Sequence, residues 1–228
     1  MQVIRTPDAA AAAARAADEI AAACREAVSV RGAALIAVSG GETPWRMLEE
    51  LCTRDLPWDR LRVAQVDERI APRGDPRRNL ARLEQILVVA GPLPRANLLA
   101  MPVDDADPAQ AAGDYQRLLE SHGGKPLQLD LVHLGLGSDG HTASLVPGDP
   151  VLEVHDRDVA VTNEYQGLRR MTLTLPALGR ARRRLWLVSG AAKAARLQQL
   201  LAGAADIPAV QVPRDATLVI CDAAAATG

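Results

Sequence analysis

The chain has 228 residues, of which 48% are hydrophobic and 24% are charged, an ordinary globular composition that excludes disorder along the whole chain. This length suits one domain, and we expect residues 1–228 to form a single one. Lys plus Arg number 26 and Asp plus Glu number 28, so the formal charge of −2 gives no general attraction to nucleic acid or anionic lipid.

Apolar runs and helical stretches alternate along the chain, which is typical of a parallel α/β sheet. The Ala-rich stretch 7–30 carries charges throughout, which predicts an amphipathic helix and excludes a signal peptide or a membrane span. The further predicted elements, in chain order, are a strand at 33–38, a helix at 44–54, a strand at 61–66, a helix at 75–89 with Pro76 in its first turn, a helix after Pro108 that runs to Leu119, a strand at 129–136, weaker strands at 159–162 and 170–175, a strand at 184–189, a helix at 190–201 and a strand at 217–221.

The predicted strands are nearly continuous apolar runs, as expected when helices cover both faces of a sheet. We therefore predict an α/β fold with a mainly parallel sheet flanked by helices on both faces, a Rossmann-like three-layer architecture. Open sheets of this kind bind ligands outside the carboxyl ends of their strands. Glycines and polar residues cluster at four such ends, at 39–41, 67–69, 137–141 and 189–190, so we expect these segments to face one crevice. The arginine-rich segment 180–184 is expected to be a solvated loop.

The segment SGGETP at 39–44 joins the first strong strand to a helix. Thr43 suits the N-cap of that helix, and Pro44 suits its first position. Free backbone N–H groups at a helix start bind anions, and glycines let the anion approach closely, so the segment is a candidate phosphate site. An ordinary strand-to-helix turn would have the same composition. The spacing matches neither a Walker motif nor a dinucleotide-binding GxGxxG.

Lys193 lies in the first turn of the predicted helix at 190–201, where the helix macrodipole disfavours a cation. An anion bound between the lysine and the helix start would explain the placement. A solvated surface lysine explains it equally well.

His141 is the only one of the four histidines that follows both a strong strand and a glycine-rich turn. An imidazole exchanges a proton near neutral pH, and Asp139 could fix its tautomer, which suggests acid–base chemistry. The alternative is a histidine that caps the next helix. We expect His122 in a loop, His133 inside a strand and His155 in a polar loop, without a chemical role.

Charged residues also border two predicted strands. Asp67 and Arg69 follow the strand at 61–66, where Arg69 could bind an oxyanion and Asp67 could orient a sugar or a water. Arg170 is the first residue of the weaker strand at 170–175, and it can have a function in the site only if its side chain faces the crevice. Charges of this kind are also common in solvated loops.

Together these segments resemble the 6-phosphogluconolactonase family. The matching stretches keep their order and spacing from residue 30 to 222, and DGHTASL is the most specific of their motifs. A wider superfamily that includes glucosamine-6-phosphate deaminases shares the other motifs. The stretches are SGGETP at 39–44, VDERIAP at 66–72 with Asn79 downstream, LGLGSDGHTASLVPG at 134–148, RMTLTLPAL at 170–178 and LVSGAAKAARL at 187–197.

The resemblance implies hydrolysis of 6-phospho-D-glucono-1,5-lactone to 6-phosphogluconate, with His141 as general base. It places Asp67 in the crevice, and Asp139 is expected either to take part in the chemistry or to hold the loop. Glu42 departs from the small hydroxyl residue frequent in the family and must point away from the phosphate, and Ser138 replaces a frequent proline. The implied phosphate-binding residues are Ser39, Gly40, Gly41 and Thr43, with Arg170 and Lys193 as cationic partners and Arg69 contributing.

Two other functions stay open. An amino-sugar-phosphate deaminase needs an acid just after the histidine loop, and none occurs here before Asp149. A non-catalytic sugar-phosphate sensor usually carries a DNA-binding segment, and no basic candidate precedes residue 30. We expect the partner to be a small sugar-phosphate lactone, without nucleic acid or membrane, and the chain to be a monomer or small homo-oligomer.

Cysteine spacing and ligand chemistry set the remaining expectations. The three cysteines are odd in number and form no CxxC pair, which argues against a disulfide framework and a zinc site and suits reduced thiols in the cytoplasm. Histidines and carboxylates show no convincing metal-ligand cluster, so we expect neither a metal nor a cofactor.

Overall fold

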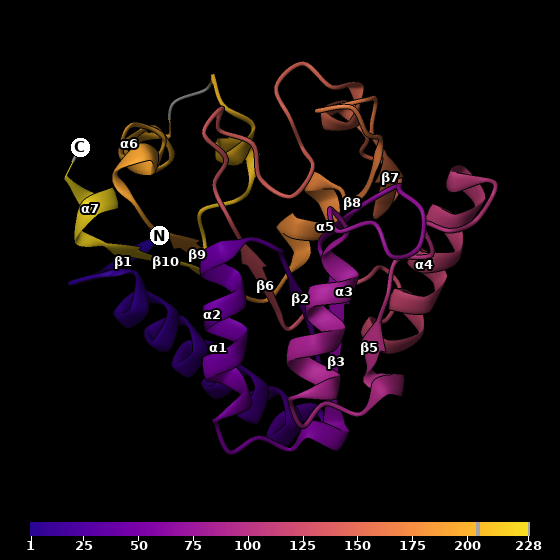
Figure 1. The fold of residues 1–228 in the computed structure, drawn as a ribbon, viewed down its shortest axis with the longest axis horizontal. Coiled ribbons are helices and arrows are strands. Elements are labelled where there is room, and N and C mark those ends of the chain that lie inside the picture. The colour runs from indigo at the N-terminus through magenta and orange to yellow at the C-terminus, as the bar shows by residue number, and fades with distance from the viewer. Residues whose placement is uncertain (204–205, 228) are drawn as a thin grey trace.

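The computed structural model describes residues 1–203 and 206–227 of the chain. A seven-stranded parallel sheet forms its centre, which confirms the predicted α/β class. The strand order is β1-β10-β9-β6-β2-β3-β5 (Figure 1). The strands are β1 (Gln2–Thr6), β2 (Ala34–Val38), β3 (Leu61–Gln65), β5 (Leu98–Leu99), β6 (Leu131–Leu134), β9 (Arg184–Val188) and β10 (Thr217–Asp222).

The sequence prediction missed β1 and β5, the two edge strands. β1 is mostly exposed and β5 has only two residues, so neither presents the apolar run that marks a buried strand. The first strand, β1, and the last helix, α7 (Ala223–Ala226), lie beside each other at the β1 edge of the sheet (Figure 1).

Helices cover both faces of the sheet because successive strand residues point to opposite sides. On β2, Ile36 packs in the apolar cluster on one side of the sheet, which we call the first face. Leu35 and Ala37 pack in the apolar cluster on the opposite side, the second face. No helix in the described parts of the chain is long and apolar enough to cross a membrane. The first face carries α1 (Ala9–Arg31), α2 (Glu42–Cys52) and α3 (Asn79–Leu83); the second carries α4 (Pro108–Gly123), α5 (Leu175–Arg180), α6 (Ala194–Ala202) and α7 (Ala223–Ala226).

Three short strands form a second, antiparallel sheet that is separate from the main sheet. It consists of β4 (Asp67–Arg69), β8 (Arg170–Leu173) and β7 (Val159–Val161), in the order β4-β8-β7. The weaker strands predicted around β7 and β8 therefore exist, and the charged segment that we placed after the strand at 61–66 is itself a short strand. Its register pairs Arg69 with Arg170. Two cations about 100 residues apart in the sequence thus become neighbours.

The helix predicted at 75–89 starts later than expected. Residues 72–78 form turns that include Pro76, and α3 begins at Asn79 and continues as a π-helical stretch, Glu84–Val89. The buried carboxylate of Glu68 accepts hydrogen bonds from the N–H groups of Asn79 (2.8 Å) and Leu80 (2.7 Å). This remote carboxylate caps the helix start, which leaves no local signal in the sequence.

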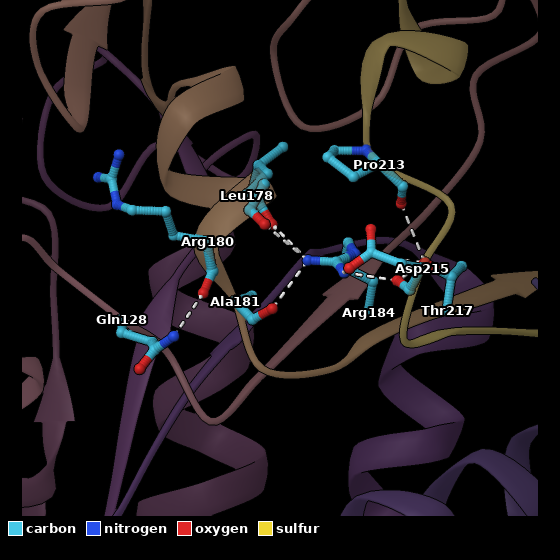
Figure 2. A network of polar contacts seen from close by, with 9 residues as sticks. Gln128, Leu178, Arg180, Ala181, Arg184, Pro213, Asp215 and Thr217 are labelled. Atoms are coloured by element: carbon cyan, nitrogen blue, oxygen red, sulfur yellow. Dashed lines mark hydrogen bonds and ion pairs between the residues drawn. The ribbon is translucent and has the colours of Figure 1, made fainter.

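Only part of the segment 180–184 is the solvated loop that we expected, because Arg182 and Arg183 are exposed whereas Arg184 is buried. Arg184 opens β9 with a side chain that is only 1% exposed. Its guanidinium donates to the carbonyl oxygens of Gly179 (2.8 Å), Ala181 (2.7 Å) and Asp215 (2.5 Å), as Figure 2 shows for the last two. Arg184 therefore ties the end of α5 to the segment that leads into β10. Carbonyl oxygens from the end of α5 and from Asp215, together with the Asp215 carboxylate at 3.3 Å, compensate for the burial of its charge.

Candidate active site

The connectivity of the main sheet reverses between β2 and β6. From β2 the chain continues to β3 and β5 on one side, whereas β6, β9 and β10 extend the sheet on the other. Ligands bind outside the carboxyl ends of strands at such a switch point. β2 leads into Ser39 and β6 leads into the glycine-rich segment 135–141, so both motifs meet there.

A cavity of about 420 Å³ opens at this switch point. All four segments that we expected to converge contribute to its wall, together with β8. The tenth site residue predicted from the sequence, Asp139, is in direct contact with His141. The other nine line the cavity: Ser39, Gly40, Gly41, Thr43, Asp67, Arg69, His141, Arg170 and Lys193.

The start of α2 differs in detail from the sequence prediction. The N-cap is Gly41, whose φ of +131° favours glycine, so Thr43 is not the cap and Pro44 is the third helical residue. The Thr43 hydroxyl shares a 2.5 Å hydrogen bond with the Ser189 hydroxyl. First-turn N–H groups have no partner within their helix, so this turn offers donors to an anion in the cavity. Glu42 is exposed but also lines the cavity.

Both hydrogen-bond donors of Ser39, its backbone N–H and its hydroxyl, are bound to His133. Its N–H donates to His133 Nδ1 (3.3 Å), and its hydroxyl donates to the His133 carbonyl oxygen (3.0 Å). Burial lowers the pKa of His133 to about 3, so the imidazole stays neutral and can accept this bond. His133, expected to have no role, therefore fixes the start of the anion loop. Donors to an anion must come from the residues after Ser39.

Arg69, Arg170 and Lys193 line the cavity, and the charges of the last two are incompletely compensated. Burial lowers the pKa of Arg170, and neighbouring Arg69 acts in the same direction while Asp67 opposes it. Arg170 Nε is buried without a hydrogen-bond partner among the described residues. Lys193 ends a 3₁₀ turn, Ala191–Lys193, before α6, and burial lowers its pKa against the opposing charge of Asp139. An anion would relieve this imbalance.

His141 and Asp139 form a hydrogen-bonded pair. His141 Nδ1 lies 2.5 Å from Asp139 Oδ1, and the His141 backbone N–H donates to the same oxygen at 3.2 Å. Burial would raise the pKa of Asp139, but the charge of His141 and these hydrogen bonds lower it overall. A carboxylate only accepts, so in its neutral form the imidazole carries its proton on Nδ1 and leaves the Nε2 lone pair available.

The loop around His141 does not cap a helix. Residues 142–149 form turns, with Thr142 bridged to Leu145, so the capping alternative is wrong. A Cβ atom at Gly137 would collide with the His141 ring, which explains the need for glycine at that position. Asp67, the other carboxylate of the site, accepts a 2.6 Å hydrogen bond from the Ser144 hydroxyl. The two carboxylates are thus held by different partners.

Sequence reasoning missed two residues that line the cavity, Tyr165 and Gln166. They form the tip of a hairpin between β7 and β8. The pair Gln166-Gly167 between two weak strands was the available signal, since glycine favours two-residue hairpin turns. Within the described residues, no group of three or more His, Cys, Asp or Glu side chains is placed to hold a metal ion.

Comparisons with known proteins agree with this geometry. The model of the family described as glucosamine-6-phosphate isomerases/6-phosphogluconolactonase matches residues 7–220. A 6-phosphogluconolactonase from Synechocystis sp. is 40% identical over 190 residues, which cover 79% of this chain and 77% of the relative. The crystal structure of a 6-phosphogluconolactonase from Thermotoga maritima has a TM-score of 0.85 at 25% identity, covering 97% of this chain and 98% of its own.

The fold itself does not separate the activities within this family. A monomeric glucosamine-6-phosphate deaminase has a TM-score of 0.87 at 20% identity, covering 99% of both chains. The choice between lactone hydrolysis and deamination therefore depends on the side chains of the site.

Proposed function

Because the chain belongs to the glucosamine-6-phosphate isomerase/6-phosphogluconolactonase family, we propose that it hydrolyses 6-phospho-D-glucono-1,5-lactone to 6-phosphogluconate, the lactone step of the oxidative pentose phosphate pathway. One observation carries the proposal. His141, with Nδ1 bound to Asp139, shares a cavity with the start of α2 and with Arg170 and Lys193. A base with a free lone pair and a separate anion site suit an electrophile that carries a phosphate.

In the proposed mechanism the phosphate binds to first-turn N–H groups of α2 and to Arg170, Lys193 and Arg69. His141 Nε2 takes a proton from a water as the water oxygen bonds to the C1 carbonyl carbon. The bond from C1 to the ring oxygen then breaks, and the imidazolium returns its proton to that oxygen, giving a hydroxyl and a carboxylic acid that ionises. General-base assistance of this kind contributes ~10²–10⁴-fold.

The residues after His141 favour hydrolysis over deamination. Ser144, Leu145 and Val146 are buried, and Ser144 is bonded to Asp67. The first acid, Asp149, accepts hydrogen bonds from the N–H groups of Val151 (2.8 Å) and Asn163 (3.0 Å). Its carboxylate is therefore committed to the loop rather than offered to a sugar ring.

The test is hydrolysis of freshly generated 6-phosphogluconolactone by wild type, His141→Ala and His155→Ala, with glucosamine-6-phosphate as a second substrate. His155 is an exposed histidine and serves as the matched control. We expect fast lactone loss by wild type and His155→Ala, a fall of ~10²–10⁴-fold in kcat for His141→Ala, and no ammonia from the amino sugar. Lactone loss no faster than the buffer blank refutes the proposal, and ammonia release supports deamination instead.

The proposal includes a setting for the enzyme. The substrate is a small sugar-phosphate lactone, and the free thiols of Cys24, Cys52 and Cys221 support a cytoplasmic location. A monomer or small homo-oligomer stays a prediction.

A further inference from the structure

The hairpin between β7 and β8 has an unusual tip. Tyr165 and Leu168 pair through both backbone hydrogen bonds (3.0 and 3.3 Å), and Gln166 and Gly167 between them have φ values of +53° and +79°. Two successive positive φ values define a type I′ turn, in which glutamine is strained. The Gln166 amide is held on both sides, because its oxygen accepts from Arg170 (3.2 Å) and its nitrogen donates to the Tyr165 hydroxyl (3.3 Å).

Tyr165 touches three groups of the site. Its hydroxyl donates to Asp139 Oδ2 at 2.9 Å. Its ring meets the His141 ring edge to face, with centroids 5.8 Å apart and planes at 69°. The Arg170 guanidinium lies over the same ring, 4.9 Å from its centroid. One side chain therefore connects the base, its carboxylate and a cation of the anion site.

Each contact has a distinct consequence. Asp139 Oδ1 is already used by His141, so the Tyr165 hydroxyl fixes the second oxygen and keeps the carboxylate from rotating away from the imidazole. Burial and the nearby Asp139 charge raise the pKa of Tyr165, so the phenol keeps its proton and stays a donor. The ring face attracts Arg170 and holds it at the cavity wall.

We propose that Tyr165 is a positioning residue for the proposed hydrolysis, holding Asp139 through its hydroxyl and Arg170 through its ring. The inference rests on the proposed function for its kinetic consequences. Its two halves separate experimentally, because Tyr165→Phe removes only the hydroxyl and Tyr165→Leu removes both contacts.

The first test measures kcat and KM for the lactone. We expect Tyr165→Phe to lower kcat by about 10- to 100-fold, the range for losing a hydrogen bond to a charged group, with KM unchanged within about twofold. Tyr165→Leu is expected to lower kcat equally and to raise KM by about 3- to 30-fold. Tyr115→Phe, at the other tyrosine of the chain, deletes a buried hydroxyl bonded to the backbone of Gln65 and Leu99 and should leave kcat unchanged. Equal kcat for Tyr165→Phe and wild type overturns the inference.

A double-mutant cycle shows whether the hydroxyl acts through Asp139. In an Asp139→Ala background, Tyr165→Phe is expected to change kcat by less than about twofold, because the acceptor is already gone. A full 10-fold loss in that background would mean that the phenol contacts the substrate itself, which contradicts a positioning role.

Two readouts do not depend on turnover. Calorimetric titration with 6-phosphogluconate should give the same Kd for wild type and Tyr165→Phe, and a Kd raised by about 3- to 30-fold for Tyr165→Leu. The ¹⁵N spectrum of the His141 imidazole should show the Nδ1–H tautomer in wild type and a mixture in Tyr165→Phe. If wild type hydrolyses no lactone, the proposed function fails while the imidazole spectrum, which needs no ligand, still decides whether Tyr165 positions Asp139. A spectrum unchanged in Tyr165→Phe overturns the role of the hydroxyl, and a Kd unchanged in Tyr165→Leu overturns the role of the ring.

Discussion

Replacing Arg184 by methionine keeps most of the buried side-chain volume but removes the donors that hold three backbone carbonyls. The carbonyl oxygens of Gly179, Ala181 and Asp215 accept from the guanidinium at 2.5–2.8 Å, and Figure 2 shows the last two. Hydrogen bonds to a charged group contribute roughly 1.5–3 kcal/mol each, whereas burying the charge costs several kcal/mol. Burial accordingly lowers the pKa of Arg184. The Asp215 carbonyl oxygen keeps a second donor, the Thr217 hydroxyl (2.9 Å), but those of Gly179 and Ala181 lose the guanidinium, so we expect the free energy of unfolding to fall by about 3 kcal/mol.

The assay is urea unfolding of wild type, Arg184→Met and Arg183→Met, followed by circular dichroism. Arg183 is the matched control, because its side chain is 44% exposed and its partner Glu26 is exposed as well, so its loss should cost under about 0.5 kcal/mol. The thermal midpoint of Arg184→Met should fall on the order of 10 °C. Arg184 lies outside the cavity, so kcat of the folded variant should match wild type. If the two variants unfold within 0.5 kcal/mol of each other, the carbonyl cluster does not stabilise the fold as argued.

Two more predictions concern the loops around the cavity and the buried imidazole. A Cβ at Gly137 collides with the His141 ring, so Gly137→Ala should lower kcat at least 10-fold. Gly113→Ala is the control, because Gly113 lies in α4 outside the cavity and its Cβ would meet only the end of the Arg117 side chain, at 3.5 Å. Equal kcat values for the two variants would exclude the steric argument. The pKa of His133 is about 3 in the folded state and about 6.5 in the unfolded state. Between these values the unfolded state binds one more proton than the folded state. The free energy of unfolding therefore falls as pH drops from 6.5 towards 3, by up to about 1.4 kcal/mol per pH unit. Urea midpoints from pH 7 to 4.5 should decline less steeply in His133→Gln, and parallel declines would contradict the assignment.

Much of the fold could be predicted from the sequence because buried strands appear in it as long apolar runs. The strands β2, β3, β6, β9 and β10 were predicted within a few residues of their bounds. Edge strands lack that pattern, and the start of α3 depends on Glu68, which reaches the helix from another strand. Arg184 reads as a surface charge until its carbonyl acceptors are known.

The candidate site divides in the same way. His141 and its glycine-rich loop stand out locally, because a histidine that follows both a strong strand and a glycine-rich turn has few other uses. Tyr165 lies in a stretch of polar sequence without a recognisable motif, and the residue that its hydroxyl contacts, Asp139, is 26 positions away in the chain. Periodicity and local motifs carry no information about which of two distant polar side chains will meet.

The sequence by itself determined the α/β class, the strand ends that form the site and the candidate base, because these follow from apolar patterning and local turn chemistry. Only the tertiary structure decided that Arg69 pairs with Arg170, that His133 holds Ser39 and that Tyr165 connects Asp139 to Arg170. Those contacts join residues far apart in the chain, so they depend on strand register and on the burial of neighbouring charges. Both are properties of the packed molecule and not of any one segment.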